Sequence, residues 1–154
     1  MVGSIDRRKY QKLIDLIQQH PSLSKFGIDI YGRVLDEPIA QELNAHAGVN
    51  IVGFSSTIPF ASYELLCHCS VMENLSIVLC EAIANNIPVV AFDVGGTVEI
   101  VNAKNGVLIP PYDLDEMASA IRRVMDGNFL LEPNTLSDAF SWDKAANSYD
   151  SLMA

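Results

Sequence analysis

The fold of this chain is decided by residues 70–100, SVMENLSIVLCEAIANNIPVVAFDVGGTVEI. A loop carrying Glu73 leads into a predicted helix, and the apolar run over 89–92 then predicts a buried strand. The Gly95-Gly96 pair predicts a tight turn before a short helix. A loop that feeds a helix start beside a parallel strand is where an open α/β sheet holds an anionic ligand. Glu73 and Glu81 would suit sugar or ribose hydroxyls there, because ionised carboxylates accept hydrogen bonds.

Helices and short strands alternate on both sides of this stretch. The expected strands span 28–31, 50–53, 65–69, 89–92 and 107–109. The expected helices span 7–19, 37–46, 76–85, 97–101 and 114–125, with a short helix or irregular turn at 58–62. Asp113, with Glu116 three positions on, has the pattern of a capping box. Strands that alternate with helices call for βαβ units covered on both faces, so we expect an α/β fold with a three-layer, Rossmann-like, doubly wound parallel sheet.

Ligands of such a sheet bind outside the carboxyl ends of its strands. The loops that would open on this edge are Gly3-Ser4, Gly32-Arg33, Gly53-Phe54, the Glu73 loop and Gly95-Gly96. We therefore expect these loops to converge on one crevice.

Composition favours a single globular domain and excludes some partners. The chain has 154 residues, of which 49% are hydrophobic, and no apolar run reaches the roughly 20 residues of a membrane span. No signal-peptide pattern is present, so we expect a cytoplasmic protein whose three cysteines, Cys67, Cys69 and Cys80, are reduced. The net charge of −9 argues against nucleic acid, but a helix start can still hold a small phosphate-bearing ligand.

The motifs together resemble those of a known family. In chain order they are Ser70-x-x-Glu73, Glu81-Ala82, Pro88-Val89-Val90, Gly95-Gly96-x-x-Glu99, the 105–110 segment NGVLIP and Phe140-Ser141-Trp142. This order resembles the C-terminal, donor-binding domain of GT-B glycosyltransferases of retaining family 4, the glycosyl transferases group 1. The resemblance implies the C-terminal half of a GT-B architecture. It covers nearly the whole chain.

The resemblance also implies a set of site residues. Glu73 and Lys9 would act at the reacting centre, the amides of Asn74, Leu75 and Ser76 would hold the transferred sugar, and Glu81 would bind the ribose. Ser4, Gly95 and Gly96 would complete the donor site, with no metal bound. The donor would be a nucleoside diphosphate sugar linked to uridine or guanosine, and no other cofactor is expected.

The sequence departs from the family pattern at the diphosphate end of this site. Gly3-Ser4 stands where the family usually has Gly-Arg, Tyr10 replaces the glycine that usually follows the lysine, and the stretch between Gly53 and Glu73 is shorter by about a helical turn. A nearby arginine, Arg7, Arg8 or Arg33, could supply the lost charge.

The resemblance places the domain boundary near the C-terminus and implies a second domain. Residues 1–140 would form the nucleotide-sugar-binding domain with a truncated first strand, and 141–154 a helix that crosses to an N-terminal domain absent here. The full-length enzyme would move a hexosyl group, with retention, to a glycan or lipid-linked acceptor for polysaccharide biosynthesis. It would be cytoplasmic, with peripheral association at the inner face of the membrane. We expect the isolated domain to be inactive.

Simpler roles remain open for each residue. Glu73 and Glu81 could be a solvated loop residue and a helix-surface residue, and Lys9 a solvated lysine of a first helical turn. Cys67-His68-Cys69 resembles a metal fragment, but strand alternation separates the histidine from the thiols and favours core packing. For the whole chain, the alternatives are a non-catalytic doubly wound signalling or binding module and half of a nucleotide-sugar epimerase.

Overall fold

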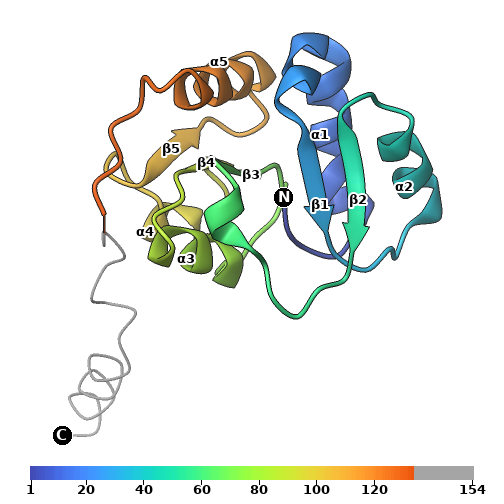
Figure 1. Cartoon of the computed structure of the whole chain (residues 1–154), viewed down its shortest axis with the longest axis horizontal. Helices are drawn as coiled ribbons and strands as arrows, with labels where there is room; N and C mark the ends of the chain where they lie inside the picture. The colour runs from blue at the N-terminus through green and yellow to red at the C-terminus, as the bar shows by residue number, and fades with distance from the viewer. Residues whose placement is uncertain (134–154) are drawn as a thin grey trace, which may run out of the picture.

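The computed structural model describes residues 1–133, and in them helices and strands alternate as expected (Figure 1). The elements are α1 (Arg7–Gln19), η1 (Pro21–Phe26), β1 (Ile28–Tyr31), α2 (Glu37–Asn44), β2 (Val49–Gly53), η2 (Phe60–Ser62), β3 (Leu66–His68), α3 (Ile77–Ala84), β4 (Val89–Phe92), α4 (Thr97–Ile100), β5 (Gly106–Ile109) and α5 (Leu114–Met125). The predicted helix at 141–154 and the boundary at residue 140 lie outside the described residues.

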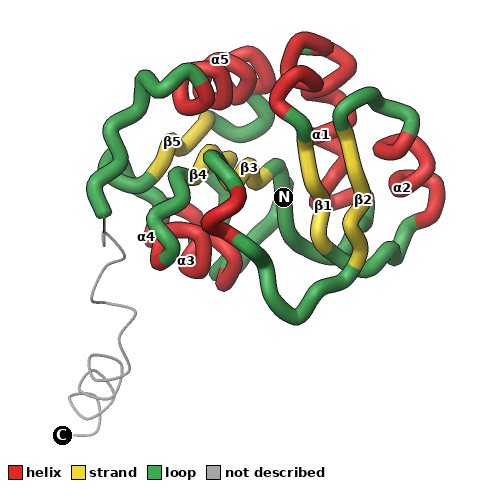
Figure 2. The backbone as a smooth tube through the Cα atoms, viewed as in Figure 1, coloured by secondary structure: helices red, strands yellow, loops and turns green. Residues whose placement is uncertain are grey.

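In residues 1–133 the strand pairings are all parallel. The strands, yellow in Figure 2, form two groups. One group is β1-β2, and the other has the order β3-β4-β5. Val2 bridges Tyr31 and Ile5 bridges Val34, both in parallel. The segment Val2-Gly3 therefore runs strand-like beside β1. The α/β class and the parallel arrangement are confirmed, and the division into two groups is an addition to the prediction.

Strand β4 is buried on both of its faces, which makes the layers visible residue by residue. Val90 and Phe92 belong to a core cluster shared with α1, α2 and α5. Val89 and Ala91 belong to a second cluster, shared with α3 and α4. Side chains alternate between the faces of a strand, so these two clusters lie on opposite sides of it. Helices thus cover both faces, as expected for a three-layer α/β fold.

A mostly apolar cavity of about 280 Å³ lies between β1 and β3. Its lining includes Leu13, Ile17, Ile28, Leu65, Ile121 and Met125. The lining runs along β1 from Ile28 to Tyr31 and includes Leu66 and Cys67 of β3. None of the predicted site residues belongs to this lining, so the cavity is separate from them.

Local capping sets several helix ends. Asp113 accepts a hydrogen bond from the Glu116 backbone N–H at 2.9 Å and so begins α5, as the capping-box pattern predicts.

The 3-10 helix Pro21–Phe26 was not predicted, and α2 ends at Asn44 instead of His46. Within residues 1–133, no helix is long and apolar enough to cross a membrane.

Candidate donor-binding site

Three of the predicted loops meet through their backbones at the carboxyl edge. The Gly32 N–H donates to the Gly53 carbonyl oxygen at 2.9 Å, and the Gly3 N–H donates to the Tyr31 carbonyl oxygen at 2.8 Å. An added Cβ at Gly32 would overlap the Gly3 carbonyl group. The absence of a side chain at Gly32 is therefore what lets the loops after Val2, β1 and β2 touch.

The Glu73 loop and the turn after β4 form a second contact of the same kind. An added Cβ would overlap the Glu73 carbonyl oxygen at Gly95 and the Asn74 carbonyl oxygen at Gly96. Gly95 also has φ +54°, which a side chain rarely adopts. The two glycines thus let the turn support the backbone of the loop that carries Glu73.

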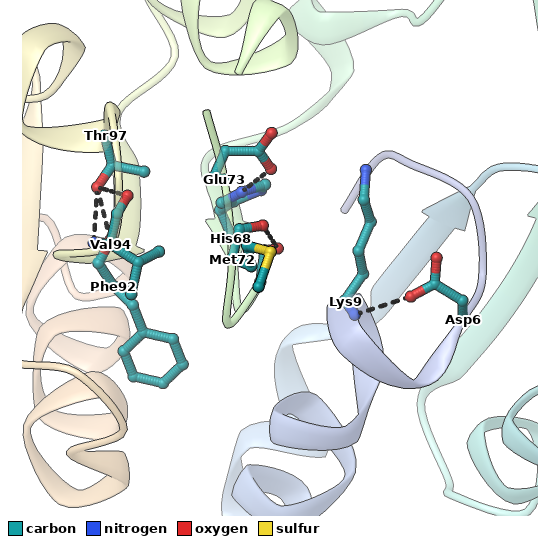
Figure 3. Close-up of polar contacts among 9 residues, drawn as sticks. Asp6, Lys9, His68, Met72, Glu73, Phe92, Val94 and Thr97 are labelled. Atoms are coloured by element: carbon teal, nitrogen blue, oxygen red, sulfur yellow. Dashed lines mark hydrogen bonds and ion pairs between the residues drawn. The ribbon is translucent and has the colours of Figure 1, made fainter. Parts of the chain in front are cut away.

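The Glu73 loop is held at several points (Figure 3). Ser70 Oγ donates to the Met72 carbonyl oxygen at 2.8 Å, and the Val71 N–H donates to the Arg8 carbonyl oxygen at 3.1 Å. The second bond ties the loop to the first turn of α1. The first bond closes a turn within the loop after β3, and the second fixes that loop to a neighbouring helix.

The Glu73 carboxylate is ionised and largely enclosed. Its Oε2 lies 3.1 Å from Nε2 of His68, and its side chain is 16% exposed. The hydrogen bond from His68 lowers the pKa of Glu73, burial opposes this, and the charges of His68, Lys9 and Arg8 lower the pKa further. The influence of Lys9 and Arg8 on this carboxylate shows that α1 brings positive charge to the same edge of the sheet.

Lys9 offers an ammonium group with no carboxylate partner. Asp6 caps α1 by accepting a hydrogen bond from the Lys9 backbone N–H at 3.2 Å, and its other oxygen pairs with Arg8 at 3.3 Å. Figure 3 shows the Lys9 side chain extending away from Asp6. Its Nζ lies over Gly3, 3.1 Å from where a Cβ would stand. In residues 1–133, no carboxylate lies within ion-pair distance of Nζ, so this half-buried cation is available to an anion.

The arginines proposed as substitutes for the missing family arginine each have a partner. Arg7 donates to the Gln11 side chain at 2.6 Å, and Arg8 pairs with Asp6. Arg33 stacks on Phe54, with its guanidinium carbon 4.6 Å from the ring centroid. Arg33 and Phe54 are both exposed at the carboxyl ends of β1 and β2. Ser4 is half-buried. The contacts of the three arginines do not single out one of them as the replacement for the positive charge that Ser4 lacks.

The remaining predicted residues lie around the start of α3. Ser76 occupies the N-cap position but makes no side-chain capping bond, and Asn74 and Leu75 are exposed before it. The first-turn amides of an α-helix have no carbonyl partner within the helix, so this start can accept an anionic or hydroxyl oxygen. Glu81 is exposed on α3, and among the described residues its carboxylate makes no contact with Glu73.

The sequence did not point to Thr97, which shapes this edge of the sheet. Thr97 is fully buried, and its Oγ accepts the Val94 N–H at 3.0 Å. The same hydroxyl donates to the carbonyl oxygen of Phe92 or of Val94, each 2.9 Å away (Figure 3). Thr97 therefore fixes the turn that carries Gly95. A threonine two positions after a Gly95 turn is a weak signal in the sequence, since its partners are backbone atoms.

Comparisons with known proteins show the family of this chain. The family model described as "Glycosyl transferases group 1" matches residues 1–127. The UDP-N-acetylglucosamine–peptide N-acetylglucosaminyltransferase GtfA subunit of Streptococcus gordonii is 32% identical over 108 residues, which cover 61% of this chain and 20% of that protein. The chain spans less than a quarter of the length of the curated relatives it matches.

Solved structures extend the likeness to the fold. The apo lipopolysaccharide outer core galactosyltransferase WaaB superposes with a TM-score of 0.76 at 20% identity, over 98% of this chain and 48% of that one. Anabaena HepE, in complex with UDP and glucose, gives 0.70 at 27% identity, over 82% of this chain and 39% of that one. The chain therefore belongs to the glycosyl transferases group 1 family and has the fold of a C-terminal GT-B domain.

Proposed function

We propose that this chain is the donor-binding half of a glycosyltransferase and holds a nucleoside diphosphate sugar at the carboxyl edge of its sheet. The observation that carries the proposal is the presence of two opposite charges at this edge that do not pair with each other. One is the largely enclosed Glu73 carboxylate, and the other is the Lys9 ammonium, which has no carboxylate partner among the described residues. A sugar hydroxyl suits the first, and a diphosphate suits the second.

The proposed division of roles follows from the positions of the groups. Glu73 and the backbone of Asn74, Leu75 and Ser76 hold the transferred sugar beside the start of α3. Lys9, with Ser4 near it, faces the diphosphate and stabilises the negative charge that develops on the leaving group. Glu81 takes the ribose hydroxyls further along α3. Gly95 and Gly96 contribute indirectly, because they pack against the backbone of the Glu73 loop.

Two relatives support a uridine nucleotide in preference to other donors. HepE was solved with UDP and glucose, and the pneumococcal O-GlcNAc transferase GtfA with UDP and GlcNAc. These proteins are 27% and 26% identical to this chain over the matched regions. We therefore extend the proposal to a UDP-linked hexose, with a GDP-linked sugar as the competing donor, and to transfer with retention of anomeric configuration.

Isothermal titration with UDP-glucose, UDP, GDP-mannose and GDP tests this proposal. We expect the 154-residue chain to bind saturably either UDP-glucose and UDP or GDP-mannose and GDP. Glu81→Ala should weaken the sugar-bearing and free nucleotides alike, by about 10- to 100-fold, because a hydrogen bond to a charged group is lost. Glu73→Ala should weaken only the sugar-bearing nucleotide. Glu64→Ala, at an exposed carboxylate near the amino-terminal end of β3, is the control.

A different pattern would contradict the proposal. If no nucleotide binds at millimolar concentration, the donor site is wrong. If Glu73→Ala and Glu81→Ala lose both ligands equally, the division of roles is wrong.

The rest of the reaction requires a second domain, and we propose that a GT-B N-terminal domain supplies the acceptor site. Met72, Leu75 and Ile77 are exposed apolar side chains beside the Glu73 loop, which suits contact with such a domain. The acceptor would be a glycan or a lipid-linked glycan, met in the cytoplasm or at the inner membrane face. Transfer from UDP-glucose by this chain alone should stay at the rate without enzyme, and detectable transfer would contradict the two-domain proposal.

A further inference from the structure

The side chain of His68 has a role that neither the sequence nor the comparisons assign. His68 ends β3 and is 4% exposed, on the same face of the strand as Leu66. Cys67 and Cys69 lie on the other face, with their sulfurs 3.5 Å apart. The strand thus separates the histidine from the two thiols and aims it at the loop that follows.

His68 meets Glu73 through one oxygen only. Its Nε2 lies 3.1 Å from Oε2, and among the described residues Oε1 has no hydrogen-bond partner. An ionised carboxylate only accepts hydrogen bonds, so Nε2 must carry the proton and donate it. The contact therefore sets both the tautomer of His68 and the direction in which Oε1 points.

Burial makes this arrangement specific. The side chains of His68 and Glu73 are 6% and 16% exposed, so few other groups compete for Oε2. Ser70 and Gly95 fix the loop backbone, but neither contacts the carboxylate. The orientation of the carboxylate therefore depends on His68.

We propose that His68 is a positioning residue for donor recognition: it holds Glu73 through Oε2, so that Oε1 is directed at a hydroxyl of the bound sugar. This inference rests on the proposed function, because it assigns Glu73 to the sugar. It goes beyond that function by naming the residue that prepares Glu73 before the ligand arrives. Binding is tighter when such a side chain is ordered in advance, since the cost of ordering it is not met at the moment of binding.

The test compares two substitutions of His68. His68→Leu removes the N–H group that donates the hydrogen bond to Glu73. His68→Gln keeps an N–H group that can reach Oε2. We expect His68→Leu to weaken UDP-glucose binding by about three- to tenfold and to leave UDP binding within twofold, since only the sugar contacts Glu73. His68→Gln should recover most of the loss. GDP-mannose and GDP replace this pair if the guanosine nucleotides bind more tightly.

A spectroscopic measurement separates positioning from a merely structural role. The ¹³C resonance of the Glu73 carboxyl group should titrate at a higher pH in His68→Leu than in the unmodified chain, and ¹⁵N shifts should show the Nε2–H form of His68. His46→Leu, at a half-buried histidine in the loop after α2, is the matched control and should change neither.

Three results would overturn the inference. These are equal losses for UDP-glucose and UDP, a Glu73 titration unmoved by His68→Leu, or a His68→Gln variant as impaired as His68→Leu. If neither nucleotide binds the unmodified chain, the proposed function fails, and the inference about sugar recognition fails with it. The Glu73 titration would then still decide whether His68 holds the carboxylate.

Discussion

Replacing Gly95 by alanine tests how the two loops of the site are fitted together. Gly95 has φ +54°, and an added Cβ would lie against the Glu73 carbonyl oxygen, well inside the 3.0 Å closest approach of real Cβ atoms. The oxygen belongs to the backbone, so no side chain can rotate to relieve the overlap. The Glu73 loop must move away from the turn, and the contact of Glu73 with His68 must change with it.

Gly127 supplies the matched control and the magnitude. It has φ +74° after α5, and nothing lies within 4 Å of an added Cβ. Gly127→Ala therefore costs only the left-handed backbone term, about 1–2 kcal/mol. Gly95→Ala should cost the same term plus the displacement of the loop, about 3–4 kcal/mol in total.

Thermal unfolding and amide NMR shifts give the measurement. A loss of 1 kcal/mol lowers the Tm by about 2–4 °C in a chain of this size, so Gly95→Ala should melt about 5 °C below Gly127→Ala. The amide shifts of residues 73–75 should change only in Gly95→Ala, and nucleotide-sugar binding should fall only there. Equal melting temperatures, with unchanged shifts at 73–75, would refute the argument that the glycine permits this contact.

Three further predictions concern the same elements. Thr97→Val should lower the free energy of unfolding, measured in urea, by about 1–3 kcal/mol, because buried backbone groups at the turn after β4 lose their hydrogen-bond partner. Thr57→Val, at an exposed loop position, is the control. An equal effect of the two substitutions would contradict this. Asp113→Ala should cost about 1 kcal/mol by removing the cap of α5, and Asp113→Asn should restore it; equal losses in both would argue against capping. The pKa of Glu73 is lowered in the folded chain, so its contribution to stability is present above about pH 4.5 and is lost as the pH falls through the folded value. Glu73→Gln should therefore reduce the acid-induced loss of stability, Glu64→Gln should not, and identical pH profiles for the two variants would contradict this.

The sequence predicted the parts of the fold that depend on local patterns. The apolar run over 89–92 marks a strand buried on both faces, and the structure places its alternate residues in two separate cores. Asp113 with Glu116 predicts a helix start, and the capping bond forms. These signals are contained within a few residues, where hydrophobic period and capping chemistry suffice.

The parts that were missed depend on approaches between distant segments. The 3-10 helix Pro21–Phe26 is too short to show a periodic apolar pattern that would predict it. Gly95 is predictable as a turn, but its fit against the Glu73 backbone is visible only in three dimensions. The predicted burial of His68 is confirmed, but its contact with Glu73 was not predicted, because this partner lies across a loop. A buried histidine that precedes a loop acid is the signal that could have drawn attention to it.

The division of the strands into β1-β2 and β3-β4-β5 was also beyond the sequence. Hydrophobic pattern gives the existence of each strand, whereas pairing depends on which edges come within hydrogen-bonding distance. Val2 and Ile5 pair with the chain beside β1 only as isolated bridges. At the carboxyl edge the Glu73 loop is tied to α1, on the side of the other group, by the hydrogen bond from the Val71 N–H to the Arg8 carbonyl oxygen.

Amide chemical-shift mapping with UDP-glucose tests the central claim most directly. The account predicts saturable shifts that gather at Ser4 and Lys9, at residues 73–76, at Glu81 and at Gly95-Gly96, with none around the apolar cavity between β1 and β3. UDP alone should shift Lys9 and Glu81 but leave Glu73 nearly unchanged. Saturable shifts centred on the cavity, or no saturable shift at millimolar UDP-glucose or GDP-mannose, would contradict the claim that this edge binds a nucleotide sugar.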